Sequence, residues 1–313
     1  MPPKGRATTV ECRRAADSGV RTFDTDGAGE GGGAGQRPAV HQAVAEGADC
    51  LLLGDVGRTL ADLPDGVVQT VVTSPPYWSL RDYGAAGQIG VHEPLPEFIG
   101  ALVAVFGGVR RVLAEDGTMW INLGDAYTSG NRGWRAPDRK NPARAMTFRP
   151  RTPDGLKDKD LIGLPWRFAL AMQEAGWYLR SDIIWYKPNC QPESVRDRPT
   201  RSHEHVFLFS KSERYLYDID AVRGVNDRRL RDVWEINTVG FTGDHFAAFP
   251  PELVRRSVLI GSRRGDYVLD PFLGSGTTAV VARAAGRRFI GCELKREYLR
   301  LAIERLGDGT KSS

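Results

Sequence analysis

The chain has 313 residues, of which 41% are hydrophobic and 26% are charged, and its formal net charge is +4. This length suits one large domain or two ordinary ones. The composition excludes a collagen-like, wholly disordered or membrane-embedded chain, since no apolar run approaches the roughly 18–20 residues that span a bilayer. The small positive charge permits a nucleic-acid partner without indicating one.

The first 47 residues differ in composition from the rest of the chain. They are rich in glycine and poor in apolar residues. Because such a segment buries too little surface to offset its backbone entropy, we expect 1–47 to be a disordered tail. We expect one structured domain over 48–306 and a short tail over 307–313.

Strand and helix patterns alternate through this domain. Apolar or β-branched runs predict strands at 50–53, 67–73, 118–123, 178–185, 205–209, 267–269 and 289–292. Helical spacing predicts helices after Asp55 and at 98–113, 164–175, 251–260 and 277–285. A polar stretch rich in Gly, Arg and Pro covers 127–159. The alternation predicts an α/β fold with a largely parallel sheet.

A glycine turn near the C-terminus joins a strand to a helix. Asp270 ends the strand, and Gly274 and Gly276 allow a sharp turn and a close approach to a ligand. With Ala279 the spacing is Gly-x-Gly-x-x-Ala, and Glu293 ends the next strand, where a carboxylate can bind ribose hydroxyls. This order predicts a nucleoside-containing cofactor, either NAD or S-adenosylmethionine. Few residues follow Glu293, so the remaining strands must come from upstream and the topology is circularly permuted.

A second loop, Ser74-Pro75-Pro76-Tyr77, follows the predicted strand at 67–73. The prolines fix the backbone and leave rigid carbonyl groups at the edge of the sheet where ligands bind. The Ser74 hydroxyl and the Pro75 carbonyl can accept both hydrogens of an exocyclic amino group, and Tyr77 can stack on its ring. We therefore predict that Ser74, Pro75, Pro76 and Tyr77 are catalytic.

These two loops, in this order, resemble the amino-group DNA methyltransferases of the permuted β class, which methylate cytosine N4 or adenine N6. The resemblance extends over 48–306 and includes the segments 163–167, 184–189, 196–205 and 245–250. It implies a Rossmann-like S-adenosylmethionine-dependent methyltransferase sheet, circularly permuted, with a small target-recognition insert. It also implies a cofactor site made of Asp55, Phe246, Pro250, Asp270, Phe272, Gly274, Gly276, Thr277 and Glu293.

The cysteines bear on which atom is methylated. Methylation of cytosine carbon-5 uses a thiolate in a Pro-Cys pair, and none of Cys12, Cys50, Cys190 and Cys292 follows a proline. Transfer to an amino nitrogen needs no covalent intermediate and no metal. In the family, Ser-Pro-Pro-Tyr accompanies mostly cytosine N4, so we expect N4 methylation, with adenine N6 as the alternative.

DNA contacts are expected from basic loops, since the target base must be flipped out of the duplex. Residues 132–151 carry a local charge of +6. The predicted contacts are Arg132, Arg135, Arg139, Lys140, Arg144, Arg196, Arg198, Arg228 and Arg229. The family places its target-recognition region at 216–243 here, and the loop 127–159 can share that task. His203-Glu204-His205 is interpreted as structural, because no further metal ligand is evident.

The expected partners are double-stranded DNA and a cognate restriction endonuclease. We expect a cytoplasmic monomer or homodimer of bacterial, archaeal or phage origin, with no membrane partner and no metal. Three other activities remain open at this point. They are N6-adenine methylation, methylation of RNA or of a protein glutamine, and DNA binding without catalysis.

Overall fold

The computed structural model describes residues 19–25, 36–128, 133–134, 150–239 and 249–308. Its elements, in chain order, are β1 (Val20–Asp24), α2 (Gln36–Ala45), β2 (Asp49–Leu53), α3 (Val56–Ala61), β3 (Val68–Thr73), α4 (Leu95–Val112), β4 (Leu113–Leu123), α5 (Leu164–Glu174), β5 (Tyr178–Tyr186), β6 (His203–Ser210), a 3-10 turn (Val225–Asp227), β7 (Val233–Glu235), α6 (Pro251–Gly261), β8 (Tyr267–Asp270), α7 (Thr277–Ala284), β9 (Arg288–Glu293) and α8 (Arg296–Asp308).

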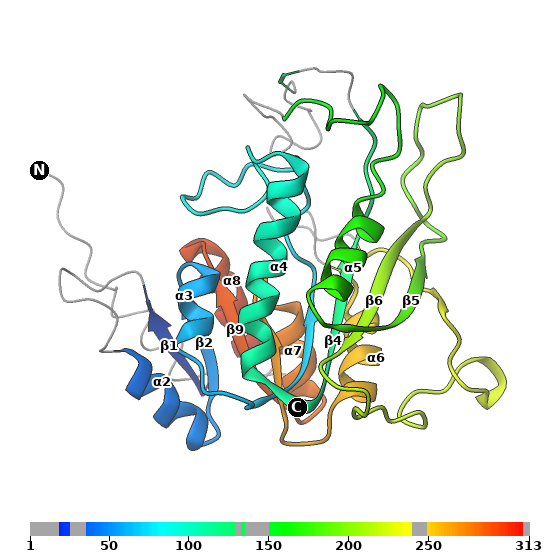
Figure 1. The fold of residues 1–313 in the computed structure, drawn as a ribbon. Coiled ribbons are helices and arrows are strands. Elements are labelled where there is room, and N and C mark those ends of the chain that lie inside the picture. Colours follow the sequence, from blue (N-terminus) through cyan, green and yellow to red (C-terminus); the bar gives the residue numbers. More distant parts are fainter. Residues whose placement is uncertain (1–18, 26–35, 129–132, 135–149, 240–248, 309–313) are drawn as a thin grey trace, which may run out of the picture.

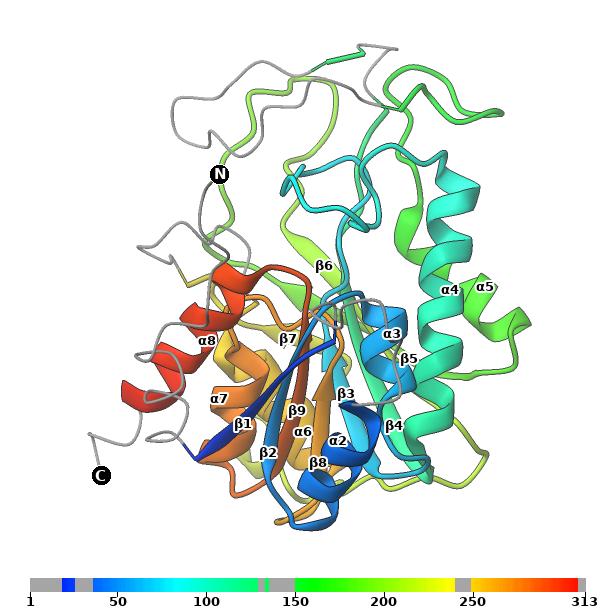
Figure 2. The same ribbon diagram turned by 90° about the vertical axis from the view of Figure 1, so that its left-hand side faces the viewer.

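The described strands form one nine-stranded sheet in the order β1-β2-β9-β8-β3-β4-β6-β5-β7. Helices α2, α3, α4 and α5 cover one face, and α6, α7 and α8 cover the other (Figures 1 and 2). All pairings from β1 to β4 are parallel, whereas β6 runs antiparallel to both β4 and β5. The predicted α/β class and the Rossmann-like, permuted sheet are confirmed, with β6 as the antiparallel exception.

The central strands are apolar because both of their faces are covered. Every residue of β2 and β8 is buried, which is typical of parallel strands between two helical layers. One apolar cluster joins the sheet to α4 and α5 around Phe106 and Phe168. A second joins it to α6, α7 and α8 around Val258 and Phe289. These clusters fix the sheet on which the loops described below are carried.

The predicted N-terminal tail is corrected in two places. β1 pairs in parallel with β2, with Val20 opposite Asp49, and forms one edge of the sheet. In α2, the side chains of Val40, Ala43 and Val44 are buried against the sheet. Both elements are short and stand among glycines, so their contribution to the core is not visible from local composition. The rest of 1–47 falls largely outside the described residues.

The region 216–243 is joined to the main sheet as far as the structure describes it. β7 pairs in parallel with β5, and the buried Trp234 stacks on Trp120 of β4 at 6.1 Å between ring centroids. Most of the loop 127–159 lies outside the described residues, and its two ends meet where Tyr127 bridges Leu161. No helix in the described part of the chain is both long and apolar enough to cross a membrane.

Helix α2 provides a test of this architecture. Val40→Ala should lower the free energy of unfolding by about 1–2 kcal/mol, because Val40 is fully buried and the substitution leaves a cavity. Arg37→Ala, at an exposed position of the same helix, should change it by less than about 0.5 kcal/mol. Urea unfolding measures both values. Equal, small effects would show that α2 is not part of the folded core.

Candidate active site

A cavity of about 410 Å³ opens at the carboxyl ends of the parallel strands. The loop after β3 contributes Ser74, Pro75, Pro76 and Tyr77 to its wall, and the loop after β8 contributes Phe272, Gly274 and Thr277. The two loops are about 200 residues apart in sequence, but β3 and β8 are neighbours in the sheet. The position agrees with the rule that ligands bind outside the carboxyl ends of such strands.

Asp270 ties the two loops together beneath the cavity. Its carboxylate accepts hydrogen bonds from Thr73 Oγ1 at 2.7 Å, from Thr278 Oγ1 at 2.7 Å and from the Phe272 backbone N–H at 3.1 Å. Asp270 is 1% exposed, and burial raises its pKa to about 6 despite these donors. It does not line the cavity. The structure therefore gives it a supporting position under the loops, whereas the sequence analysis placed it in the cofactor site.

Glu293 lies at the cavity wall beside the glycine turn. Its Oε2 accepts a hydrogen bond from Gly274 N at 2.8 Å, and its Oε1 accepts one from Lys295 N at 2.8 Å. Burial raises the pKa of Glu293 to about 7, and these backbone donors oppose that shift. Each oxygen keeps a second acceptor site. The carboxylate is thus held in place and can still bind hydroxyl groups of a ligand.

Gly276 has a packing role. Its φ is +82°, and a Cβ built there would come within 2.7 Å of the Ala302 Cβ on α8. Gly276 is not among the residues that line the cavity. Its lack of a side chain allows α7 and α8 to pack closely, whereas Gly274 stands at the cavity itself.

The remaining residues predicted to bind the cofactor fall into three groups. Asp55 lines the cavity and also caps α3, where its Oδ1 accepts from Gly57 N at 3.0 Å. Pro250 is buried at the start of α6, and its neighbour Phe249 lines the cavity instead. Phe246 lies outside the described residues.

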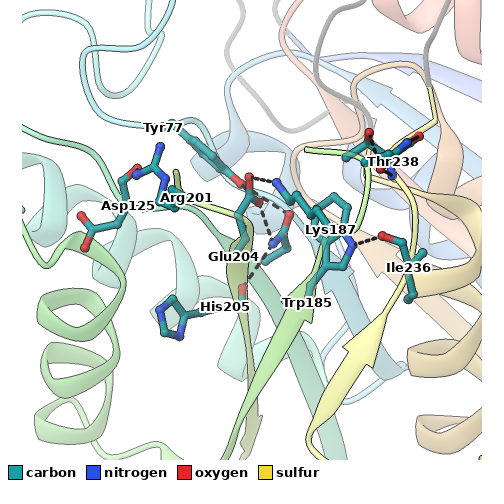
Figure 3. A network of polar contacts seen from close by, with 11 residues as sticks. Tyr77, Asp125, Trp185, Lys187, Arg201, Glu204, His205, Ile236 and Thr238 are labelled. Atoms are coloured by element: carbon teal, nitrogen blue, oxygen red, sulfur yellow. Dashed lines mark hydrogen bonds and ion pairs between the residues drawn. The ribbon is translucent and has the colours of Figure 1, made fainter. Parts of the chain in front are cut away.

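Tyr77, in the cavity wall, is held by a polar network (Figure 3). Its hydroxyl donates to Glu204 Oε2 at 2.7 Å, and Asn122 Nδ2 donates to the same oxygen at 3.0 Å. The Lys187 ammonium pairs with Glu204 Oε1. Burial is the largest cause that raises the pKa of Tyr77 well above its usual value of 10, and the nearby Glu204 carboxylate adds to the shift. The phenol therefore stays protonated and acts as a donor.

Sequence reasoning missed this network. Asn122, Lys187 and Glu204 all line the cavity, and none was assigned a role there. One signal was available in the sequence. Side chains alternate along a strand, so Glu204 must lie on the opposite face of the sheet from His203 and His205 and have different partners. His205 Nδ1 instead contacts Asp182 Oδ1 at 2.8 Å, which supports a structural role for the histidine. Among the described residues, no group of three or more metal-ligating side chains is found.

The predicted DNA contacts are only partly visible. Arg196, Arg228 and Arg229 are exposed. Arg198 is half-buried: its guanidinium contacts Glu193 and stacks on Tyr127 at 3.8 Å from the ring centroid, so it joins two loops of the protein. Five predicted contacts lie outside the described residues, namely Arg132, Arg135, Arg139, Lys140 and Arg144.

Cys292 is the only cysteine in the cavity wall as far as the chain is described. Burial, as the largest cause, raises its pKa to about 12. A thiol with so high a pKa carries almost no thiolate at neutral pH, and the thiolate is the nucleophilic form. The described part of the cavity wall therefore presents no activated sulfur for covalent attack on a carbon atom.

The raised pKa of Glu293 makes stability depend on pH. A carboxyl group whose pKa rises from 4.5 to about 7 on folding favours the folded state when protonated. Its contribution is complete below pH 4.5 and is lost as pH rises through about 7. The ligand-free protein should lose about 2–3 kcal/mol from this group between pH 5 and 8.

In Glu293→Gln the side chain is neutral at every pH. The part of the fall in unfolding free energy that comes from Glu293 should therefore disappear. The loss due to Asp270 should persist, because its pKa is also raised, to about 6. Urea unfolding at several pH values checks this. Parallel profiles for the two proteins would contradict the assignment.

Comparisons with known proteins agree with this geometry. The chain is 57% identical over 260 residues to the type II methyltransferase M.Cfr9I of Citrobacter freundii, covering 82% of this chain and 87% of that protein. It is 54% identical over 262 residues to the type II methyltransferase M.SmaI of Serratia marcescens, covering 82% and 90%.

Two solved structures share the fold. The PvuII DNA methyltransferase (cytosine-N4-specific) has a TM-score of 0.62 at 22% identity, covering 83% of this chain and 90% of that one. A putative DNA modification methylase of Thermus thermophilus, solved with S-adenosyl-L-methionine, has a TM-score of 0.60 at 26% identity, covering 84% and 95%. The family model described as DNA methylase matches residues 68–304. The chain therefore belongs to the N6/N4 DNA methylase family.

Proposed function

We propose that this protein transfers a methyl group from S-adenosylmethionine to the exocyclic N4 of a cytosine flipped out of duplex DNA. One observation carries the proposal. The loop Ser74–Tyr77 and the glycine turn with Glu293 line the same cavity. The loop is suited to an amino group on a planar ring, and the turn with Glu293 to a ribose.

The cofactor end has donors and acceptors that fit S-adenosylmethionine. The free acceptor sites of Glu293 would bind the ribose hydroxyls, and Gly274 leaves room for the backbone to approach. Asp55 and Phe272 would line the adenine and methionine parts of the pocket. The volume of about 410 Å³ lies in the range of ordinary small-molecule sites. Bound there, the cofactor supplies an electrophilic methyl group on a sulfonium.

At the other end, the protein would position the amino group. The Ser74 hydroxyl and the Pro75 carbonyl would accept its two hydrogens, which directs the nitrogen lone pair towards the methyl group. Tyr77 would stack on the base, a contact worth about 1–3 kcal/mol. Positioning of this kind can supply much of the rate enhancement, because the reaction becomes effectively unimolecular.

One feature favours a nitrogen over a carbon as the methylated atom, and another favours cytosine over adenine as the target base. The protonated Cys292 thiol gives no nucleophile for carbon-5 chemistry. Ser74 offers a small, uncharged acceptor, and Ser-Pro-Pro-Tyr accompanies cytosine N4 in most members that this chain resembles. Adenine N6 is the alternative target, and identifying the methylated nucleoside distinguishes the two.

The DNA would approach over the exposed arginines and the basic loop. Arg196, Arg228 and Arg229 are available to phosphate groups, and the 127–159 loop adds local positive charge. The relatives at 54–57% identity are named type II methyltransferases. We therefore propose a restriction-modification role here too, with a cognate endonuclease that cuts the same site.

The product of the reaction is the direct test. Incubation with labelled S-adenosylmethionine and duplex DNA, followed by digestion to nucleosides, should give N4-methylcytosine. Detection of N6-methyladenine alone would replace the cytosine assignment. No labelled nucleoside from a protein that binds the cofactor would contradict the activity itself.

Substitutions at the two ends of the cavity should separate chemistry from cofactor binding. Ser74→Ala should lower the single-turnover rate by about 10- to 100-fold and change the cofactor Kd by less than about 3-fold, because only an acceptor for the amino group is lost. Glu293→Gln should instead weaken cofactor binding by about 10-fold or more.

Rapid-quench kinetics and calorimetry measure these quantities. Glu115→Gln, on an exposed part of β4 at the opposite end of the strand, is the control and should leave both unchanged. If Ser74→Ala weakened cofactor binding as much as it slowed transfer, Ser74 would not act on the amino group.

A further inference from the structure

The polar cluster around Glu204 lies outside the two loops that carry the proposed function. It brings together side chains from two strands and from the segments that follow two others: Asn122 on β4, Glu204 on β6, Lys187 just after β5 and Tyr77 after β3 (Figure 3). The Glu204 and Lys187 side chains are only 17% and 15% exposed. A buried ion pair is costly to form and is weak as a source of stability. This cluster therefore invites a functional explanation.

The cluster fixes the direction of the hydrogen bond from Tyr77. Glu204 Oε2 receives two donors, the Tyr77 hydroxyl at 2.7 Å and Asn122 Nδ2 at 3.0 Å, and Oε1 receives the Lys187 ammonium. A carboxylate opposite a lysine only accepts hydrogen bonds. The Tyr77 hydroxyl has a second acceptor, Asn122 Oδ1, at 3.4 Å, so the much shorter and charged contact with Glu204 is its main hydrogen bond.

This hydrogen bond bears on what Tyr77 can do. Tyr77 lines the cavity, and its hydroxyl is anchored by the short contact with Glu204. The anchor holds the tyrosine ring in one orientation at the cavity wall. A ring held in this way offers a fixed aromatic surface on which a base can stack.

Sterics support a fixed arrangement. A Cβ on Gly124 would lie 3.0 Å from Tyr77 Cε2 and 3.1 Å from Glu204 Cδ. Gly124 thus lets the tyrosine ring and the carboxylate close on each other. The Lys187 ammonium lies 4.1 Å from the centroid of the Trp185 ring, and Trp185 Nε1 donates to Ile236 O at 2.8 Å. The lysine is therefore held on the side of Glu204 away from Tyr77.

We infer that Glu204, with Lys187 as its counter-charge, is a positioning residue that anchors the Tyr77 hydroxyl and so holds the Tyr77 ring in place for stacking on the target base. The inference rests on the proposed methyl transfer and applies to either amino target. Glu204 acts through Tyr77 and is not assigned a contact with the substrate.

A double-mutant cycle tests this directly. Glu204→Gln keeps the shape of the side chain but removes the charged acceptor of the Tyr77 hydroxyl and the counter-charge of Lys187. Tyr77→Phe keeps the ring and removes the hydroxyl. Each variant should lower the single-turnover methyl-transfer rate by about 10- to 100-fold. Because both break the same hydrogen bond, the double variant should be within about 3-fold of the slower single variant.

The cofactor Kd and the DNA Kd provide the readout that a merely structural role would move. Both should change by less than about 3-fold in these variants. Glu115→Gln removes a second Glu–Lys pair, with Lys211, at the opposite end of β4 and β6 and should leave the rate unchanged. Gly124→Ala crowds Tyr77 and Glu204 without removing a polar group, and it should slow transfer while preserving cofactor binding.

The outcomes separate this inference from the proposed function. If the unmodified protein transfers no methyl group to DNA, the proposed function fails. If it transfers methyl groups and Glu204→Gln does so equally fast, the positioning role alone fails. It also fails if the effects of Glu204→Gln and Tyr77→Phe multiply, or if cofactor affinity falls in step with the rate.

Discussion

The cavity depends on one buried carboxylate. Asp270 ends the central strand β8 and binds the last residue of β3, the first turn of α7 and the backbone of the glycine loop. Burying the Asp270 carboxylate without hydrogen-bond donors would cost several kcal/mol, and its three donors offset much of that cost. The two loops are thereby held at a fixed separation. Methyl transfer between two bound molecules requires that separation, since misplacement by about 1 Å can cost about 100-fold in rate.

Much of the fold could be predicted from local sequence. The central strands are continuous apolar runs bounded by glycine or proline, and the glycine turn with a following acid marks one βα unit whatever its place in the chain. β1 and α2 were missed because an edge strand and a short helix need few apolar residues of their own. They take their stability from β2 and the sheet, which is tertiary information.

Site residues that belong to one loop could be predicted from the sequence. Site residues that only the sheet topology brings together could not. Ser74–Tyr77 and Glu293 line the cavity as expected, because each loop carries its own backbone geometry. The Glu204 cluster was not predictable, since it requires β6 to be inserted antiparallel between β4 and β5. The same limit applies to Asp270, Gly276 and Arg198. Their residue types suggested ligand contacts, and the structure uses them for a hydrogen-bonded bridge, a helix contact and a loop contact.

The stacking of Trp234 on Trp120 has a consequence for how such an enzyme could change its target sequence. β7 extends the catalytic sheet, and Thr238, a few residues later, lines the cavity and is bonded to Asn189. The segment proposed for target recognition is thus built into the catalytic core at this end. It cannot be exchanged as an independent module without removing part of the cavity wall. A change of specificity within this segment would have to leave the tryptophan stack and Thr238 in place.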